Sequence, residues 1–450
     1  MNESERKYHT KEEILRKAQD IIGIPIKDID KTQRISTGKG AIGSVIEESW
    51  FEYSINSNSK PDFEEAGVEL KVTPYIVGKK GIRAKERLVC NIINYMEEYK
   101  NTFKTSSFWK KCNTMLLMSY EHKNNIPKGD FTISKATLFS FPEKDLRIIE
   151  QDWKTIIDKI KSGKAHEISE GDTLYLGACT KGANSKSLRQ QPFSSILAKQ
   201  RAYSLKQSYM TYVLNAYIFG SEEDENIITN PEDLKEKTFE EYIIDKITPY
   251  IGCSEKELFE KFNVTKKSKN MFEMIVARIL GVKGHLSSTE EFKKANIIPK
   301  TIRVQKNGKI KENMSFPKFD FIELSREEWE TSTLKKYLEP TKFMFIVFQE
   351  KSNGEYYLDR LKFWNIPLSD LEEVHKVWQK TVDIINEGVV LTKTSRGVAN
   401  NLPKKTENRV AHVRPHGKNG DDKNMLPDGR KMTKQCFWLN NTYLEEIISN

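Results

Sequence analysis

An internal repeat limits the folds that this 450-residue chain can adopt. The motifs of the first half recur in the same order in the second half. A helix-capping motif opens each half, and aromatic, Thr and Ser residues then recur ahead of an apolar strand. The matched segments are 10–13 with 254–257, 62–66 with 291–295, 103–106 with 329–332, Trp153 and Gly163 with Trp378 and Gly388, 181–184 with 413–419, and the segment around Tyr203 with 433–439. Because the order is kept, we expect two tandem lobes of one shared fold.

Length and composition agree with a globular protein of more than one domain. The chain is too long for one ordinary core, and 37% of its residues are hydrophobic. We expect a first domain over residues 1–220, an acidic linker over 221–250 and a second domain over 251–450. No apolar run approaches a membrane span and the N-terminus is too charged for a secretory signal, so we expect a cytoplasmic protein with no membrane partner.

The net charge of +9 favours a polyanionic partner. Nucleic acid is the usual polyanion for a basic protein. Many basic proteins bind no DNA, so the charge gives only modest support to this interpretation.

The stretch 61–74 carries the candidate chemistry of the first half. Apolar residues alternate with Glu69 and Lys71, which predicts a strand that presents a carboxylate and an ammonium on one face, with Asp62 in the loop before it. Oxygen ligands suit Mg²⁺, and a lysine beside them can orient or deprotonate a water next to a phosphate. Taken alone, the pattern also fits a solvated strand face.

A third acid, Glu47, is expected on a helix over 44–51. It lies beside the apolar stripe formed by Ile42, Val45, Ile46 and Trp50. A carboxylate at such an edge is either an ordinary helix charge or an acid directed at the metal.

The stretch 174–184 reads as a strand that runs into a loop. Lys181 and Asn184 would bring donors that read base edges in the major groove, and Gly182 would let the backbone approach a ligand. Arg189 follows in a basic segment suited to phosphate contacts. An ordinary basic loop remains the alternative.

The second half lacks the acids of the first. In the repeat, Ile298 replaces Glu69, the counterpart of Glu47 falls near Ala277, Glu291 replaces Asp62, and Lys300 corresponds to Lys71. A basic loop with Arg414, His416 and Lys418 is kept. We therefore predict one metal-dependent lobe and one lobe that binds DNA or acts allosterically without cutting, with a purely supporting role for the second lobe as the alternative.

Together these motifs resemble the MutH-related endonucleases. The residues concerned are Lys39-Gly40-x-x-Gly43-x-x-x-Glu47, Pro61-Asp62, Gly67-Val68-Glu69-Leu70-Lys71, Trp153 and Lys181-Gly182-Ala183-Asn184. The two-lobed layout resembles the type II restriction enzymes of that family that cut at GATC. The resemblance implies an α/β architecture of two restriction-endonuclease-like lobes, each with a mixed central sheet flanked by helices.

The resemblance also implies a reaction and its residues. It implies Mg²⁺-dependent hydrolysis of double-stranded DNA at GATC, leaving 5′-phosphate ends. Asp62 and Glu69 would be metal ligands, Glu47 would support the metal or its water, and Lys71 would stabilise or activate the nucleophile. The implied DNA-binding residues are Lys39, Lys181, Gly182, Asn184, Arg189 and Tyr203 in the first lobe and Arg414, His416 and Lys418 in the second.

Departures and alternatives limit this assignment. Cys179 stands where a single-lobed relative has an arginine, whereas Arg414 keeps that arginine in the second lobe. A strand-nicking mismatch-repair endonuclease and a non-catalytic DNA-binding protein remain alternative functions. One active site per chain must cut two strands, so either two chains form a DNA-induced homodimer or one chain cuts twice. A cognate DNA methyltransferase is the expected partner in the same cell.

Overall fold

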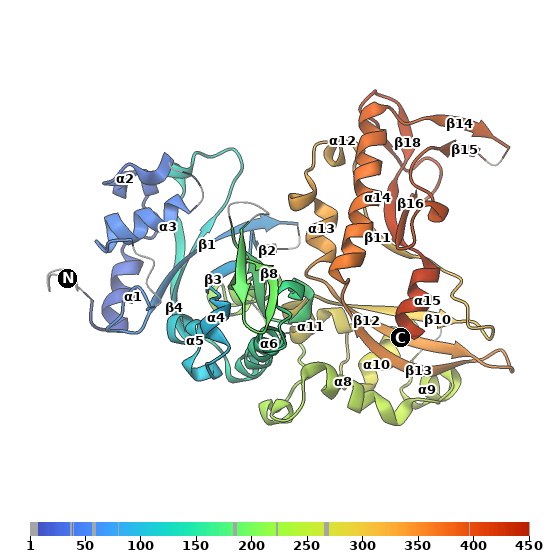
Figure 1. Cartoon of the computed structure of the whole chain (residues 1–450), viewed down its shortest axis with the longest axis horizontal. Helices are drawn as coiled ribbons and strands as arrows, with labels where there is room; N and C mark the ends of the chain where they lie inside the picture. Colours follow the sequence, from blue (N-terminus) through green and yellow to red (C-terminus); the bar gives the residue numbers. More distant parts are fainter. Residues whose placement is uncertain are drawn as a thin grey trace. The chain divides into compact units, whose positions relative to one another are not determined.

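The computed structural model describes residues 8–36, 38, 40–55, 60–79, 81–182, 187–221, 224–264, 270–395 and 397–449. The chain divides into two compact units, Met1–Tyr242 with Ser287–Ile297, and Ile243–Leu286 with Ile298–Asn450 (Figure 1). This division differs from the predicted linker over 221–250, because the first part of that segment packs in the first unit. The backbone amides of Ile227 and Ile228 donate to the buried carboxylate of Glu291 at 2.8–3.0 Å, which holds both segments together.

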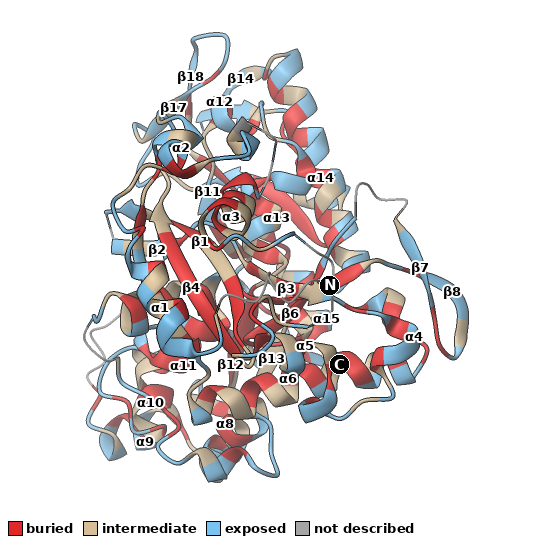
Figure 2. Ribbon diagram, turned by 90° about the vertical axis from the view of Figure 1, so that its left-hand side faces the viewer, coloured by how far each residue is buried: buried red, intermediate tan, exposed pale blue. Residues whose placement is uncertain are grey.

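The first unit is built on a four-stranded sheet in the order β2-β1-β4-β5. Its strands are β1 (Glu69–Gly78), β2 (Gly81–Ala84), β4 (Thr114–Glu121) and β5 (Ile133–Ser140). β1 and β4 are parallel, while β2 and β5 run antiparallel to their neighbours. β4 is the buried centre, since the apolar residues from Met115 to Met118 are inaccessible to solvent (Figure 2). The sheet is therefore mixed, as predicted.

A second sheet in the same unit has the order β3-β9-β6. It consists of β3 (Leu88–Ile92), β9 (Arg201–Leu205) and β6 (Leu176–Thr180), and the hairpin β7 (Leu188–Gln191) and β8 (Ser194–Lys199) extends from it. The helices are α1 (Lys11–Gln19), α2 (Ile26–Ile29), α3 (Ala41–Val45), α4 (Tyr95–Glu98), α5 (Ser107–Cys112), α6 (Glu143–Lys161), α7 (Gln207–Tyr212) and α11 (Glu290–Ala295), with α8 (Phe239–Ile247) crossing into the second unit. α6 buries an apolar stripe that includes Trp153, Ile156, Ile157 and Ile160.

The second unit repeats this plan. One sheet has the order β10-β12-β13 and another the order β11-β19-β16, while β14 pairs with β15 and β17 with β18. The strands are β10 (Ile297–Val304), β11 (Met314–Lys318), β12 (Lys342–Glu350), β13 (Tyr356–Trp364), β14 (Leu391–Thr394), β15 (Gly397–Asn400), β16 (Ala411–Pro415), β17 (Lys423–Met425), β18 (Lys431–Thr433) and β19 (Gln435–Leu439). The helices are α9 (Glu255–Lys261), α10 (Met271–Ile279), α12 (Phe321–Leu324), α13 (Thr333–Leu338), α14 (Leu368–Glu387) and α15 (Asn441–Ser449).

Equivalent residues cap or end equivalent helices in both units. Ser106 caps α5 and Ser332 caps α13, each by accepting a hydrogen bond from the amide three residues on. Gly163 follows α6 with φ of 70°, and Gly388 follows α14 with φ of 108°. These matches confirm two α/β lobes with one shared plan. Glu291 departs from the predicted repeat, since it lies on α11 of the first unit.

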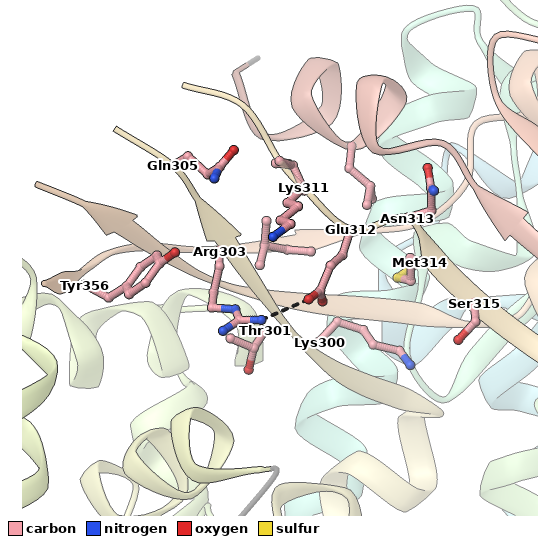
Figure 3. A pocket seen from close by; sticks show the side chains of 13 residues that line it. Lys300, Thr301, Arg303, Gln305, Lys311, Glu312, Asn313, Met314, Ser315 and Tyr356 are labelled. Atoms are coloured by element: carbon pink, nitrogen blue, oxygen red, sulfur yellow. Dashed lines mark hydrogen bonds and ion pairs between the residues drawn. The ribbon is translucent and has the colours of Figure 1, made fainter. Parts of the chain in front are cut away.

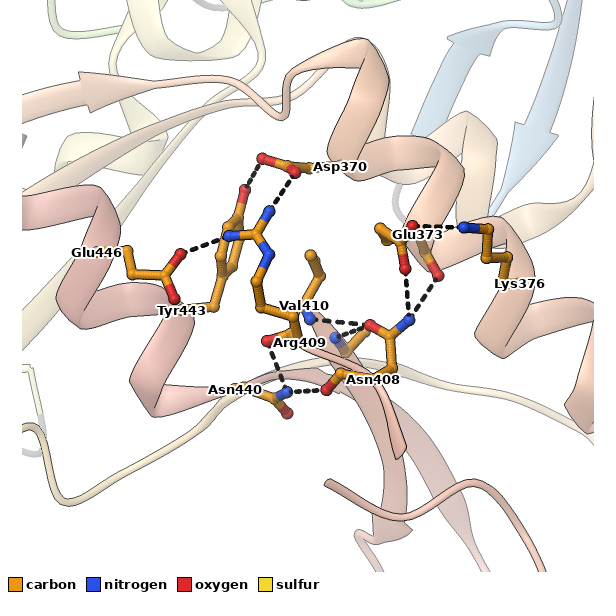
Figure 4. A network of polar contacts seen from close by, with 10 residues as sticks. Asp370, Glu373, Lys376, Asn408, Arg409, Val410, Asn440, Tyr443 and Glu446 are labelled. Atoms are coloured by element: carbon orange, nitrogen blue, oxygen red, sulfur yellow. Dashed lines mark hydrogen bonds and ion pairs between the residues drawn. The ribbon is translucent and has the colours of Figure 1, made fainter. Parts of the chain in front are cut away.

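A polar network ties the terminal helix of the second unit to its long helix (Figure 4). The guanidinium of Arg409 donates to Asp370 Oδ1 at 2.6 Å and pairs with Glu446. The hydroxyl of Tyr443 donates to the other oxygen of Asp370 at 2.6 Å. α14, α15 and the segment that leads into β16 are thereby fixed to one another, and β16 carries Arg414.

Candidate active site and nucleic-acid interface

A tight turn places Asp62 beside the start of β1. Phe63 and Val68 exchange two backbone hydrogen bonds of 2.9 and 3.2 Å, and Gly67 allows the turn with a φ of 64°. Residues seven apart in the sequence, Asp62 and Glu69, therefore face one another across the turn. The predicted strand with a preceding acidic loop is confirmed.

Asp62, Glu69 and Lys71 form one hydrogen-bonded group. The Asp62 amide donates to Glu69 Oε2 at 3.2 Å, and the Leu70 amide donates to Asp62 Oδ2 at 2.9 Å. Lys71 Nζ donates to Glu69 Oε1 at 2.9 Å and to the carbonyl of Cys90 on β3 at 3.2 Å. The group thus lies where β1 and β3 approach each other.

A second lysine joins this group from α5. Lys111 Nζ lies 3.5 Å from Glu69 Oε1, and only 12% of its side chain is exposed. Sequence reasoning missed Lys111, since nothing local marks it apart from its neighbour Lys110. Only the packing of α5 brings it to the acids.

Glu47 belongs to the same electrostatic cluster. It lies on a π-helical turn, Ile46–Trp50, that continues α3. Burial, followed by repulsion from Asp62 and Glu69, raises the pKa of Glu47 to about 8. Burial also raises the pKa of Glu69 to about 6, with Lys71 opposing and Asp62 adding to the rise. The three acids that the sequence singles out therefore lie close enough to influence one another's charge.

The donor set fits a divalent cation, although the side chains do not point at a common centre. Within the described ranges, no three His, Cys, Asp or Glu residues are arranged to hold a metal as they stand. Asp62 and Glu69 instead accept hydrogen bonds from amides and from Lys71. Three carboxylates close together, two of which (Glu47 and Glu69) have raised pKa values, are nevertheless the charge distribution that a cation relieves.

The predicted DNA-binding residues of the first unit have different positions. Lys181 and Gly182 are exposed directly after β6, and Arg189 is exposed on β7. Lys39 and Asn184 lie outside the described residues. The prediction for Tyr203 is corrected, because its ring is completely buried on β9, the central strand of its sheet. A phenol in that position packs in the core and has no surface to offer DNA.

An aromatic residue that sequence reasoning missed, Trp438 on β19, lies against the basic loop of the second unit. Arg414 is exposed on β16, and its guanidinium lies 5.7 Å from the centre of the half-buried Trp438 ring. The ring of His416 meets the same indole edge-on at 5.1 Å. Lys418 is exposed, and its amide donates to Asp422 at 3.0 Å. Cationic side chains around an aromatic ring are typical of nucleic-acid surfaces.

Two further findings concern the predicted absence of a membrane span and the predicted counterparts of Glu47 and Lys71 in the second unit. No helix in the described parts of the chain combines the length and apolarity needed to cross a membrane. Ala277, the predicted counterpart of Glu47, is completely buried on α10, and Lys300 lies on β10.

Comparisons with known proteins place the chain in a family. The family described as DNA mismatch repair enzyme MutH matches residues 51–152, a segment that contains Asp62, Glu69 and Lys71. The DNA mismatch repair protein MutH of Shewanella baltica is 28% identical over 46% of this chain and 95% of its own length. A solved complex of the restriction endonuclease MvaI with cognate DNA aligns with 47% of this chain and 96% of its own, at 11% identity and a TM-score of 0.20, too low to support an argument.

One relative matches both units. The type II restriction enzyme Sau3AI of Staphylococcus aureus is 38% identical over 98% of this chain and 99% of its own length. The match extends over both lobes, whereas the mismatch-repair relatives cover about one lobe. The chain therefore belongs to the MutH-related family of type II restriction endonucleases.

Proposed function

We propose that this protein hydrolyses double-stranded DNA at GATC in a Mg²⁺-dependent reaction that leaves 5′-phosphate ends. The observation that carries the proposal is the convergence of Asp62, Glu69 and Lys71 at the start of β1. The likeness over both units to a type II restriction enzyme supports double-strand cutting. The motifs from Lys39 to Asn184 support GATC as the site.

Each member of the cluster has a proposed role. Asp62 and Glu69 would hold the cation, with Glu47 supporting it or its water. Bound Mg²⁺ would offset the charge of the attacked phosphodiester. Although burial opposes the shift, the carboxylate of Glu69 raises the pKa of Lys71 above its usual value, so Lys71 is an ammonium in this arrangement. Lys71 therefore orients the water and stabilises the developing charge.

The second unit would bind DNA without cutting it. Arg414 and Lys418 supply cations, His416 supplies a ring nitrogen, and Trp438, between Arg414 and His416, supplies a stacking surface. The predicted counterparts of Glu47 and Glu69 in this unit, Ala277 and Ile298, are not acids. An allosteric site that responds to a second GATC copy fits this combination.

The biological setting follows from the proposed reaction. An enzyme that cuts GATC would act in the cytoplasm and require a cognate methyltransferase to protect the cell's own DNA. Cutting both strands with one acid cluster per chain requires either a DNA-induced homodimer or two successive cuts by one chain.

Digestion of a mapped supercoiled plasmid tests the proposal. With Mg²⁺ we expect linear fragments whose sequenced ends fall at GATC and carry 5′-phosphates, and we expect no cutting with EDTA. Open circles that persist without linear product would instead indicate the alternative function, a strand-nicking endonuclease. Binding without any cutting would favour a non-catalytic DNA-binding protein.

A further inference from the structure

A pocket of about 350 Å³ in the second unit has no role in the proposed reaction (Figure 3). It lies between β10 and the segment that leads into β11, and its charged lining residues are Lys300, Arg303, Lys311 and Glu312. Polar side chains of Thr301, Gln305, Asn313 and Ser315 complete much of the wall. The lining thus carries three cations and one carboxylate.

The single carboxylate is already paired. Arg303 Nη2 lies 3.0 Å from Glu312 Oε1, so those two charges offset each other, as the dashed contact in Figure 3 shows. Lys300 and Lys311 have no hydrogen-bonded or ion-paired partner in the described parts of the chain. The pocket therefore presents two ammonium groups whose charge no neighbouring side chain in the wall offsets.

Lys300 is also substantially withdrawn from water. Burial lowers its pKa below the usual lysine value, and the more distant carboxylate of Glu273 opposes that shift. A half-buried cation that no carboxylate contacts directly is costly, and an anion in the pocket would lower that cost.

The pocket corresponds in the repeat to the acid cluster of the first unit. β10 and β11 stand in the sheet order of the second unit where β1 and β3 stand in the first. Lys300 is the sequence counterpart of Lys71, which lies between β1 and β3. The first unit has acids and a lysine at this position, which suits a metal cation. The second unit has a lysine-lined pocket there instead, which suits an anion.

We propose that this pocket binds a phosphate group, held by the ammonium groups of Lys300 and Lys311 and by the neighbouring hydroxyl and amide side chains. Such donors are the ordinary protein partners of phosphate oxygens. The phosphate comes either from the DNA backbone or from a free phosphate compound. The first source rests on the proposed DNA-binding function, whereas the second does not.

The test uses the full-length protein and three methionine substitutions that keep the lysine stem but remove the charge. Lys300→Met and Lys311→Met alter the pocket and are made singly and together in a double variant. Lys306→Met removes an exposed lysine of the same unit that does not line it, and serves as the matched control. In the first measurement, each variant is titrated with a GATC duplex in EDTA at several salt concentrations. In the second, the unfolding temperature of each variant is measured with added inorganic phosphate and compared with that in chloride of equal ionic strength.

A backbone phosphate in the pocket predicts a weaker salt dependence of DNA binding in the double variant. Each neutralised phosphate contributes about 0.9 to the slope of log K against log salt, so loss of the one phosphate in the pocket should lower the size of the slope by about 0.9, with the control unchanged. A free phosphate predicts that phosphate raises the unfolding temperature of wild type and control more than that of the double variant.

The outcomes separate the two proposals. If wild type cuts GATC plasmids and both measurements are the same for all variants, the pocket proposal is overturned while the nuclease proposal stands. If wild type neither binds nor cuts DNA but phosphate protects it through Lys300, the nuclease proposal fails and the pocket stands. Equal protection by phosphate in wild type and the double variant, with an unchanged DNA slope, counts against the pocket.

Discussion

The ammonium of Lys71 donates to Glu69 Oε1 at 2.9 Å, although the two residues lie only two positions apart on one strand. Strand geometry places both side chains on the same face, and their contact fixes the acid next to the amine. A cation that binds Glu69 would therefore sit beside a fixed positive group.

Removing either partner should abolish most of the cutting. We expect Glu69→Gln and Lys71→Met to lower the rate of plasmid cleavage by on the order of 10³, because each removes a charge that acts on the reacting phosphate. Glu64→Gln is the matched control, since Glu64 is an exposed acid of the same turn that pairs with Lys60. Rates close to wild type for Glu69→Gln would mean that the assigned site is wrong.

Lys111 should support the acids from α5. Its ammonium is one of the groups that lower the pKa of Glu47, so Lys111→Met should raise that pKa further. We expect cleavage to fall by about 10- to 100-fold at neutral pH and to recover partly as the pH is raised. Lys110→Met changes an exposed neighbour on the same helix and should leave the pH–rate profile unaltered. Identical profiles for the two variants would remove Lys111 from the site.

Binding of Mg²⁺ should release protons at neutral pH. With pKa values of about 8 for Glu47 and about 6 for Glu69, the metal-free site holds protons near pH 6 that a cation must displace. We therefore expect the Mg²⁺ affinity to rise as the pH increases from 6 to 8.5. Calorimetric titrations in buffers of different ionisation enthalpy count the protons, and Glu47→Gln should reduce their number. A proton count of zero at pH 6 contradicts this charge assignment.

The same shift makes the metal-free protein less stable at higher pH. An acid whose pKa is higher in the folded state binds its proton more tightly there, so stability falls as the pH rises from about 4.5 towards 8. Glu47→Gln removes the part of that dependence due to Glu47 and should raise the free energy of unfolding at pH 8 by about 1 kcal/mol or more, since one pKa unit corresponds to about 1.4 kcal/mol. Denaturant unfolding in EDTA at pH 5 and pH 8 measures the difference, which should shrink at the lower pH.

Local sequence signals explain which parts of the site could be predicted. Asp62, Glu69 and Lys71 lie within ten residues, so strand alternation and one turn are enough to bring them together. Lys111 could not be found this way, because its approach depends on the packing of α5 against a distant strand. Tyr203 was misplaced because every residue of β9 is buried, including the polar ones, which removes the alternation that would mark an outward face.

The repeat was also predictable from local sequence signals. Caps and helix ends depend on a few local residues, and Ser106 and Ser332 keep their roles in both units. The division of the chain was not predictable, since Glu291 binds amides of a segment more than sixty residues earlier. Acidic composition suggested a linker there, whereas buried hydrogen bonds place the segment in the first unit.

The aromatic residue of the second unit supplies the last prediction. Trp438 lies against Arg414 and His416, and its indole nitrogen donates to the carbonyl of Arg414 at 3.2 Å. If this surface binds DNA, Trp438→Ala should weaken binding by about 1–3 kcal/mol, the usual loss for a stacked base, while Trp438→Phe should retain much of it. Arg414→Met should also lower the salt dependence of binding, and Lys336→Met on α13 is the charge-matched control.

Cleavage of plasmids with one and with several GATC sites separates an allosteric role from a supporting one. If this surface is an allosteric site, plasmids with several sites should be cut faster than plasmids with one. Trp438→Ala should reduce that difference in cleavage rate, while the unfolding temperature stays near that of wild type. If the second unit only supports the first, Trp438→Ala should leave the ratio of cleavage rates for the two plasmids unchanged. Any loss of cutting should then be accompanied by a lower unfolding temperature.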